Sequence, residues 1–281
     1  MAALRIAIFN LLHGMSLTTG RVTEGDLRAA VADLDADIMG LQEVDHAQER
    51  SAGIDQTAVI ADELGARHWR FVPSVLGTPG PVRTWARATD GEPRPGVASY
   101  GVGLVSRYPI RQWKVQRFAA APGWTPLLVA GDPPRIMRIP DEPRVAIAAV
   151  VDAPHGPLTV ITAHLSFVPG FNVAQLRRLA RWATTLPGPH LLIGDFNLPG
   201  LVPRLVTGWT QLARIATYPA PRPRVQFDHV LGRGVDLEAV RAVSARHLAV
   251  SDHRALVVDL ELAPVGERSA RDRGDHQSRT A

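Results

Sequence analysis

The chain has 281 residues, a formal net charge of +4 at pH 7 and no cysteine. Without cysteine it can form neither disulfides nor thiolate zinc sites, so any metal must be bound by oxygen or imidazole ligands. It contains no run of about 18 consecutive apolar residues, which excludes a membrane-spanning helix. Because the N-terminal segment is typical of a strand and carries no signal-peptide pattern, we expect a cytoplasmic protein.

Short apolar runs rich in Val, Ile and Leu recur along the chain and predict strands. In chain order these runs are 4–10, 38–43, 69–73, 101–107, 145–151, 158–164, 190–195, 226–231 and 255–262. Helical patterns cover 27–34, 56–64 and 173–186, the last with Asn172 as its N-cap. Strands alternate with helices but also follow one another directly. This mixture predicts an α/β (α+β) protein in which two mixed β-sheets pack face to face with helices outside.

The composition predicts one folded domain over residues 1–263 and a disordered tail over residues 264–281. The tail has almost no large apolar residues, so burial could not offset the entropy lost on ordering it. Two stretches rich in proline and glycine, 74–99 and 119–142, contain Trp85 and Trp124. Loops this long either form a substrate-recognition rim or are mobile surface insertions, and both interpretations stay open.

The positive charge comes almost entirely from arginine, because Lys114 is the only lysine. A basic surface is compatible with a nucleic-acid partner. A GC-rich genome would produce the same arginine bias, so the charge is weak evidence for an acidic partner.

Polar residues follow several of the predicted strands. Asn10 and Glu43 end the first two, and a glutamate flanked by apolar residues needs a partner for its charge, such as Mg²⁺ or Mn²⁺. Asp195 and Asn197 follow the strand 190–195, two residues apart, so an extended backbone would point both to one side. A carboxylate there could deprotonate water while the amide donates to a phosphoryl oxygen. The alternative is ordinary turn chemistry.

A second acidic group lies near the C-terminus. We predict that His253 contacts a phosphate, that Asp228 orients its ring, and that Asp252 is a metal ligand, because a carboxylate partner fixes the tautomer of an imidazole and raises its basicity. His229 is expected to be structural, because it points to the opposite face of its strand. His164 ends another strand. Its position alone indicates a structural histidine at a strand edge, with its hydrogen bonds already made within the fold.

Taken in order, these motifs resemble those of the endonuclease/exonuclease/phosphatase superfamily, which includes deoxyribonuclease I, exonuclease III-type abasic-site enzymes, sphingomyelinases and inositol-polyphosphate 5-phosphatases. The resemblance covers nearly the whole chain up to Leu262. The matching segments are Asn10, Gln42-Glu43, Tyr100 to Arg107, Thr162 to Leu165, Gly194 to Asn197, Asp228 and Ser251 to His253. It implies a four-layer α-β-β-α sandwich with the site in a cleft at one end of the two sheets.

The resemblance also implies roles for the metal ligands and the attacking water. Glu43 corresponds to the main ligand of Mg²⁺, with Mn²⁺ as an alternative, and Asn10 and Asp252 assist it. Asp195 corresponds to the residue that activates the attacking water, and Asn197 to an amide that orients the phosphate.

The remaining roles concern the phosphate. His164 matches a position that contacts it, which replaces the structural interpretation given above. His253 with Asp228 corresponds to the pair that stabilises the transition state. Arg144 resembles a phosphate-binding arginine of some members, and Tyr100 lies in a matching segment, so both are predicted to bind substrate.

The predicted function is Mg²⁺-dependent hydrolysis of a phosphoester by water, with a nuclease or phosphodiesterase slightly favoured and a monomer expected. A phospholipid or sphingomyelin substrate, an inositol phosphate or phosphosugar, and a non-catalytic binding module on the same fold are the alternatives. Abasic-site endonucleases carry an acidic residue two positions after the first-strand asparagine. This chain has Leu12 there, which disfavours their metal arrangement and substrate.

Overall fold

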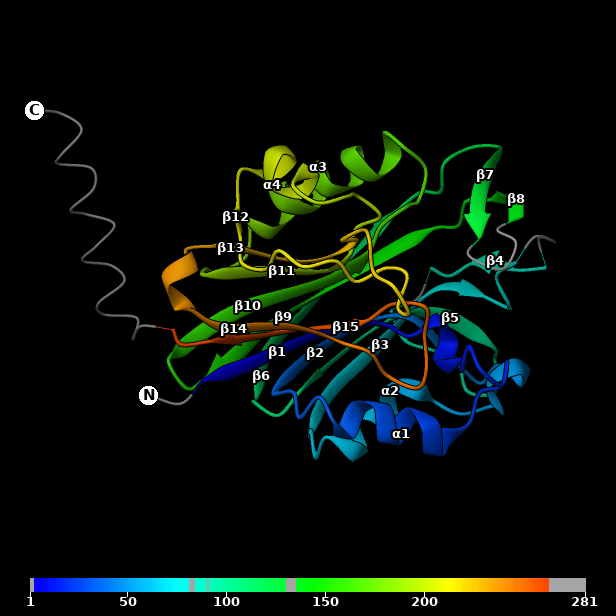
Figure 1. The fold of residues 1–281 in the computed structure, drawn as a ribbon, viewed down its shortest axis with the longest axis horizontal. Helices are drawn as coiled ribbons and strands as arrows, with labels where there is room; N and C mark the ends of the chain where they lie inside the picture. The colour runs from blue at the N-terminus through cyan, green and yellow to red at the C-terminus, as the bar shows by residue number, and fades with distance from the viewer. Residues whose placement is uncertain (1–2, 81–83, 90, 130–134, 263–281) are drawn as a thin grey trace, which may run out of the picture.

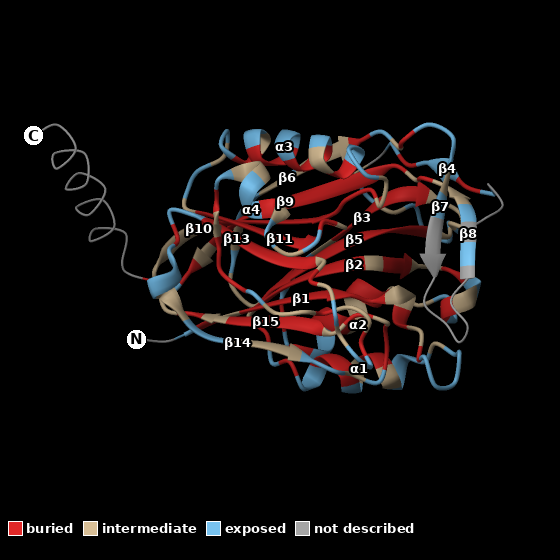
Figure 2. Cartoon of the chain, turned by 45° about the horizontal axis from the view of Figure 1, so that its top comes forward, coloured by how far each residue is buried: buried red, intermediate tan, exposed pale blue. Residues whose placement is uncertain are grey.

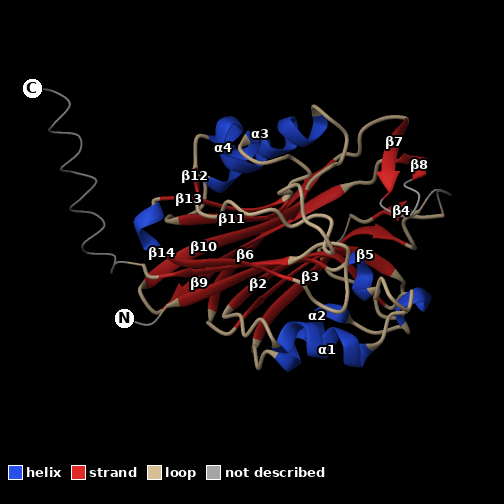
Figure 3. Cartoon of the chain, in the orientation of Figure 1, coloured by secondary structure: helices blue, strands red, loops and turns tan. Residues whose placement is uncertain are grey.

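The computed structural model describes residues 3–80, 84–89, 91–129 and 135–262. Two large β-sheets pack face to face, and helices cover the outer face of each (Figures 1 and 3). This arrangement confirms the predicted sandwich of two mixed sheets flanked by helices. The predicted disordered tail, residues 264–281, lies outside the described residues.

The first sheet has the strand order β14-β15-β1-β2-β5-β3-β4. β1 pairs in parallel with β2 and antiparallel with β15, so the sheet is mixed. The bounds are β1 (Leu4–Asn10), β2 (Ile38–His46), β3 (His68–Leu76), β4 (Ala86–Arg87), β5 (Ser99–Ser106), β14 (Val240–Arg246) and β15 (Ala255–Leu260).

The second sheet has the order β12-β13-β11-β10-β9-β6, and only β10 and β11 in it run parallel. Its bounds are β6 (Ile110–Phe118), β9 (Arg144–Ala153), β10 (Gly156–His164), β11 (His190–Asp195), β12 (Thr210–Gln211) and β13 (Asp228–Arg233). A separate hairpin joins β7 (Trp124–Val129) to β8 (Arg135–Pro140).

Strand periodicity places the core. In β1, Ile6 and Ile8 join the cluster between the sheets, whereas Ala7 and Phe9 join the cluster under the helices of the first sheet. Successive strand residues point to opposite faces, so a central strand covered on both sides must be apolar throughout. Figure 2 shows the result, a buried interior of strands with exposure confined to the outer helices, edges and loops.

The helices are α1 (Glu24–Ala32), α2 (Gln56–Glu63), α3 (Phe171–Ala183) and α4 (Val202–Thr207), with 3-10 turns η1 (Leu12–Gly14), η2 (Glu49–Ser51) and η3 (Leu237–Ala239). Thr23 and Asp55 cap α1 and α2 by accepting from backbone amides. The predicted N-cap of α3, Asn172, is wrong, since Gly170 occupies that position. Asn172 is instead buried inside the helix, where its amide donates to the carbonyl of Asn197 at 2.9 Å.

All nine predicted strands are present, with boundary shifts of a few residues. The sequence reasoning missed the edge strands β6 and β14, whose residues are mostly half-buried or exposed and therefore lack a clear apolar pattern. The stretch 119–142 is not all loop, since it contains β7 and β8. Of the tryptophans on the two proline-rich stretches, Trp85 is buried against Val75 and Tyr100, while Trp124 is 56% exposed.

Candidate active site

The polar residues predicted to act together gather at one end of the sandwich, from both sheets. On the second sheet the strand register sets His164 beside Asp195, and Asp195 beside Asp228. On the first sheet Asn10 ends β1, and His253 precedes β15. Because β1 and β15 are neighbours, their site residues emerge at the same end of the sheet.

Asn10 bridges the two sheets. Its amide nitrogen donates to Glu43 Oε1 and to Asp195 Oδ2, each at 3.0 Å, and its Oδ1 accepts from the backbone of Leu12 at 3.1 Å. The side chain is 1% exposed. A buried amide with both ends bonded is fixed in orientation, so Asn10 holds the two carboxylates at a set separation.

Glu43 does not end its strand as predicted, because β2 continues to His46. The pairing of β2 with β5 slips between Leu41 and Val44, and Glu43 has a φ of 54°. A bulge of this kind re-aims a side chain without ending the strand. Burial and the nearby charge of Asp252 raise the pKa of Glu43.

Asp228 and His253 form the closest pair of the site. His253 Nδ1 lies 2.8 Å from Asp228 Oδ2, which also accepts from the hydroxyl of Thr217 at 2.5 Å. The ring of Tyr218 packs on the imidazole with centroids 4.9 Å apart. Burial disfavours the charged imidazole, but Asp228, Asp195 and Asp252 together outweigh it and raise the pKa of His253 to about 10. His253 is therefore a cation at neutral pH.

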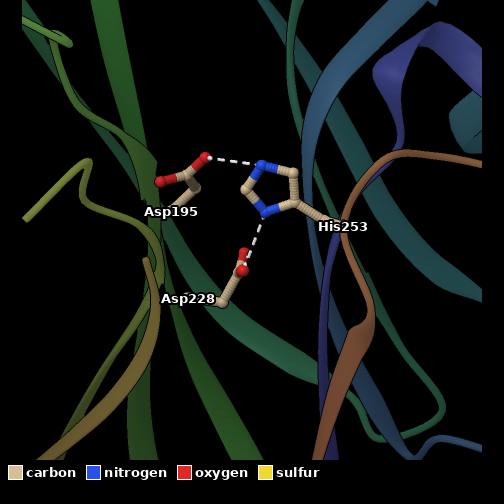
Figure 4. A group of neighbouring side chains, drawn as sticks. All are labelled: Asp195, Asp228 and His253. Atoms are coloured by element: carbon tan, nitrogen blue, oxygen red, sulfur yellow. Dashed lines mark hydrogen bonds and ion pairs between the residues drawn. The ribbon is translucent and has the colours of Figure 1, made fainter. Parts of the chain in front are cut away.

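Asp195 is 1% exposed, and Figure 4 shows the ring of His253 between Asp195 and Asp228. Its Oδ2 accepts from Asn10 and lies 3.8 Å from His253 Nε2, while Oδ1 accepts from the backbone of Asn197 at 2.9 Å. Burial and the neighbouring Asp228 raise the pKa of Asp195 to about 7, against the opposing effects of His253 and the hydrogen bonds. A carboxyl group with this pKa can release and accept a proton near neutral pH.

The backbone after Asp195 was predicted to be extended through Asn197, and this prediction is wrong. β11 ends at Asp195, and Asn197 has a left-handed φ of 51°, as the turn interpretation allows. The residue still lies in the site, because its amide donates to the carbonyl of Leu165 at 3.0 Å and lies 3.2 Å from His164 Nε2. Asn197 therefore lies close to His164 and Leu165, and the turn, not an extended strand, sets the orientation of its side chain.

His164 is buried in the site and lies 3.7 Å from Asp195 through Nε2. Its Nδ1 is 3.3 Å from Arg144 Nη1 and its Nε2 is 3.2 Å from Asn197 Nδ2, so a nitrogen donor faces each ring nitrogen. Burial, then the charges of Arg144 and His253, hold the pKa of His164 well below its usual range. The imidazole of His164 is therefore neutral.

Arg144 is 5% exposed and already paired with two carboxylates that sequence reasoning did not single out. Its guanidinium lies 3.3 Å from Asp141 and 3.0 Å from Glu142. Burial raises the pKa of Glu142 to about 7 despite the arginine. Arg144, His164 and Tyr100 line one small cavity, so the structure brings both residues predicted to bind substrate next to His164. The sequence offered one signal for these ion pairs, because Asp141 and Glu142 lie only two or three residues before Arg144.

Two sets of side chains could hold a metal ion. Asp195, Asp228 and His253 place ligand atoms within 4.8 Å of one another. However, the ring of His253 is cationic, and an imidazole protonated on both nitrogens has no lone pair with which to bind a metal. Glu43 and Asp252 are the better donors, because neither forms a salt bridge to any described residue and each has a raised pKa.

His229 faces away from the site, as predicted for a structural residue. Its ring is fully buried, stacks on Phe196 with centroids 5.6 Å apart, and contacts the carbonyl of Leu198 at 2.8 Å. Burial lowers its pKa to about 4. A neutral, packed ring of this kind supports the turn that follows Asp195.

Solved structures of similar fold extend these observations. An endonuclease/exonuclease/phosphatase from Beutenbergia cavernae has 21% identity and a TM-score of 0.62, covering 94% of this chain and 72% of that one. Sphingomyelinase C from Streptomyces griseocarneus has 15% identity and a TM-score of 0.57, over 93% and 100% of the two chains. A mannosyl-6-phosphatase from Bacteroides thetaiotaomicron has 16% identity and a TM-score of 0.57, over 92% and 100%.

At these identities the structures establish the fold alone. No curated protein sequence matches the chain. A family model described as the endonuclease/exonuclease/phosphatase family matches residues 7–253, a range that includes every site residue from Asn10 to His253. Because this match spans both sheets and the complete site, the chain belongs to the endonuclease/exonuclease/phosphatase family.

Proposed function

We propose that the protein is a Mg²⁺-dependent phosphoester hydrolase, a phosphodiesterase or nuclease in type, in which Asp195 activates the attacking water. The observation that carries this proposal is the position of Asp195. It is buried, held by Asn10 from the first sheet, and flanked by the neutral His164 and the cationic His253. A base, a neutral donor and a cation around one point suit attack on a phosphoryl group.

The groups around the phosphate divide the work. Asp195 accepts the proton of the water. Asp228 keeps His253 charged, and His253 and His164 donate to the phosphoryl oxygens on which negative charge grows. Asn197 orients the phosphate. These donors are buried and fixed by their own partners, so little reorganisation is needed when the charge develops.

Glu43, with Asp252 as a further oxygen donor, would hold the cation, whereas Asn10, predicted as a third ligand, turns its amide nitrogen toward Glu43 and its Oδ1 toward the backbone of Leu12. The donor set fits Mg²⁺ or Mn²⁺, because it consists of hard oxygen ligands and two carboxylates without a basic partner among the described residues. Bound there, Mg²⁺ would supply neutralising charge and polarise a phosphoryl oxygen.

The substrate class rests on weaker support. Sphingomyelinase C and mannosyl-6-phosphatase share the fold, so the fold alone does not choose between a lipid, a sugar phosphate and a nucleic acid. A lipid head group would be favoured by exposed tryptophans on both proline-rich stretches, but Trp85 is buried. Leu12 disfavours an abasic-site substrate. We therefore favour a phosphodiester of a nucleic acid, cleaved by a cytoplasmic monomer.

Within the described residues no helix is long and apolar enough to cross a membrane. Catalysis is tested with bis-p-nitrophenyl phosphate and Mg²⁺. We expect turnover by the wild type and a loss of about 10²-fold or more in kcat for Asp195→Asn and for His253→Ala. Asp259→Asn, which alters a partner of Arg5 away from the site, should leave kcat unchanged.

Circular dichroism and thermal melts of each variant separate lost chemistry from lost folding. Wild-type rates in both folded site variants would contradict the assignment. A protein that neither binds Mg²⁺ in calorimetry nor hydrolyses the diester would instead be a binding module on the same fold.

A further inference from the structure

Two arginines lie on a loop beside the site and take no part in the contacts described above. The loop, residues 217–225, joins β12 to β13 and closes as a hairpin, because Tyr218 and Val225 form an isolated antiparallel bridge. Arg222 and Arg224 lie at its tip and are exposed. Neither side chain forms a hydrogen bond or ion pair with another described residue.

This lack of partners contrasts with three other arginines near the site. Arg50 makes a two-pronged pair with the buried Asp45, Arg144 is held by two carboxylates, and Arg254 donates to a backbone carbonyl at 2.7 Å. Those guanidinium groups are committed to the fold. The guanidinium groups of Arg222 and Arg224 remain available to a ligand.

The loop is attached directly to the catalytic groups. Thr217 donates to Asp228, the ring of Tyr218 packs on His253, and the backbone amide of Ala220 donates to the carbonyl of Asp252 at 2.7 Å. In Figure 1 the loop is the yellow segment that runs beside the orange loop before β15. The tip therefore cannot move away from the site without disturbing the pair formed by Asp228 and His253.

The composition of the tip restricts its conformation. Pro219, Pro221 and Pro223 alternate with the residues that carry the charges. Proline fixes φ and lowers the conformational entropy of a chain segment, so the arginines are presented at a smaller entropic cost than on a glycine-rich loop. A charged tip that is both restrained and free of partners is suited to bind an anion.

The distance from the site is bounded by the chain. Arg222 is four residues from Tyr218, so the two Cα atoms lie at most about 14 Å apart. One strand of duplex DNA carries a phosphate about every 3.4 Å along the helix axis. A strand with its scissile phosphate at His253 therefore has other phosphates within reach of the tip.

We propose that Arg222 and Arg224 bind the phosphates of a nucleic-acid strand that flank the scissile phosphodiester, and so select a polymeric substrate. This inference rests on the proposed phosphodiesterase function. Guanidinium groups bind phosphate oxygens in pairs, and such contacts position a strand without reading its sequence.

A lipid surface fits the loop less well. Segments that dock on membranes combine cations with large apolar side chains that enter the acyl region. No large apolar residue of the loop 217–225 is exposed, and the exposed Trp124 and Ile136 belong to the separate β7–β8 hairpin. Charge without apolar anchors favours a soluble polyanion.

The test compares the double variant Arg222→Ala/Arg224→Ala with wild type on four substrates: bis-p-nitrophenyl phosphate, a single-stranded DNA 20-mer, its duplex and an RNA 20-mer. On the nucleic acid that the wild type cleaves best, we expect kcat/KM to fall at least tenfold at low salt, mostly through KM. The small diester, which has no flanking phosphate, should be hydrolysed at the wild-type rate. This comparison also verifies that the variant is folded.

Salt provides a second readout. Removing two phosphate contacts should flatten the slope of log(kcat/KM) against log[salt] by about 1.8 for a duplex or about 1.4 for a single strand. The matched control is Arg67→Ala/Arg233→Ala, which removes two exposed arginines at the opposite end of the sheets. It changes net charge equally and should leave both the KM and the slope near wild type.

The alternatives give distinct results. An equal effect of the two double variants, or unchanged KM and slope in the loop variant, would overturn the inference. So would a wild type that hydrolyses the small diester but none of the nucleic acids, or a loop variant that loses only the binding of anionic phosphatidylserine vesicles. A wild type inactive on the small diester as well would contradict the proposed function itself.

Discussion

Asp228 controls the charge state of the site through one side chain. Its Oδ2 faces His253 at 2.8 Å and is the largest influence that keeps the imidazole charged against burial. Its charge also contributes to the raised pKa of Asp195. One residue thus contributes to both raised pKa values, although burial is the largest cause for Asp195.

A bell-shaped pH profile should follow. Asp195 acts when ionised, so activity should increase as pH rises through about 7, and His253 acts when protonated, so activity should decline as pH approaches about 10. In Asp228→Asn both limbs should move to lower pH, because the neutral amide no longer favours either protonated form. Rates measured from pH 5.5 to 10, together with proton NMR of the imidazole, check this shift.

The same pH series in Asp259→Asn should reproduce the wild-type limbs. An Asp228→Asn variant with reduced kcat but unmoved limbs would mean that Asp228 acts only by holding the ring in place.

Among the elements, β2 shows how local irregularity builds the site. Its apolar pattern identifies the strand, but the bulge between Leu41 and Val44 is set by its pairing with β5. Such a slip depends on a strand distant in sequence and leaves no mark on the pattern of β2 itself. The sequence therefore ended the strand at Glu43, whereas the structure continues it and redirects the glutamate.

The two sheets lie close together at Gly40 of β2. A Cβ atom added there would lie 2.6 Å from Thr162 Oγ1 and 2.8 Å from Ile193 Cδ1, both on the second sheet. Gln42 also donates to that hydroxyl at 3.0 Å. A larger residue at position 40 must separate the sheets or break this hydrogen bond.

Gly40→Ala should therefore destabilise the fold by about 1–3 kcal/mol, the usual range for overpacking. Urea denaturation measures the change. Gly25→Ala is the matched control, because Gly25 lies in α1 with open space around it, and alanine is the better helix former. Equal stability of the two variants would mean that the sheets adjust to the methyl group without cost.

At the scale of the whole molecule, the site exists only because two sheets meet. Asn10, Glu43 and His253 come from the first sheet, and His164, Asp195 and Asp228 from the second. A cation held by this end of the sandwich would bind the folded chain and not the unfolded one. Ligands of this kind stabilise a fold by mass action.

Mg²⁺ should therefore raise the melting temperature. At 100 times its dissociation constant the expected stabilisation is about 2.7 kcal/mol, and chelation with EDTA should reverse it. Glu43→Gln should abolish the increase, whereas Glu238→Gln, an exposed glutamate at the opposite end of the sheets, should retain it. Differential scanning fluorimetry across a Mg²⁺ series measures this, and an undiminished shift in Glu43→Gln would exclude that residue as a ligand.

The sequence by itself determined the central strands of the two sheets and the polar residues that end three of them, Asn10, His164 and Asp195, since both depend on local apolar patterns and on residue type. It also indicated the family. Only the tertiary structure decided how these residues face one another: Asn10 joining carboxylates from the two sheets, Asp141 and Glu142 holding Arg144, and Thr217 securing Asp228. These contacts arise between segments far apart in the chain or from the conformation of turns. They depend on strand register and sheet packing, which no local pattern specifies.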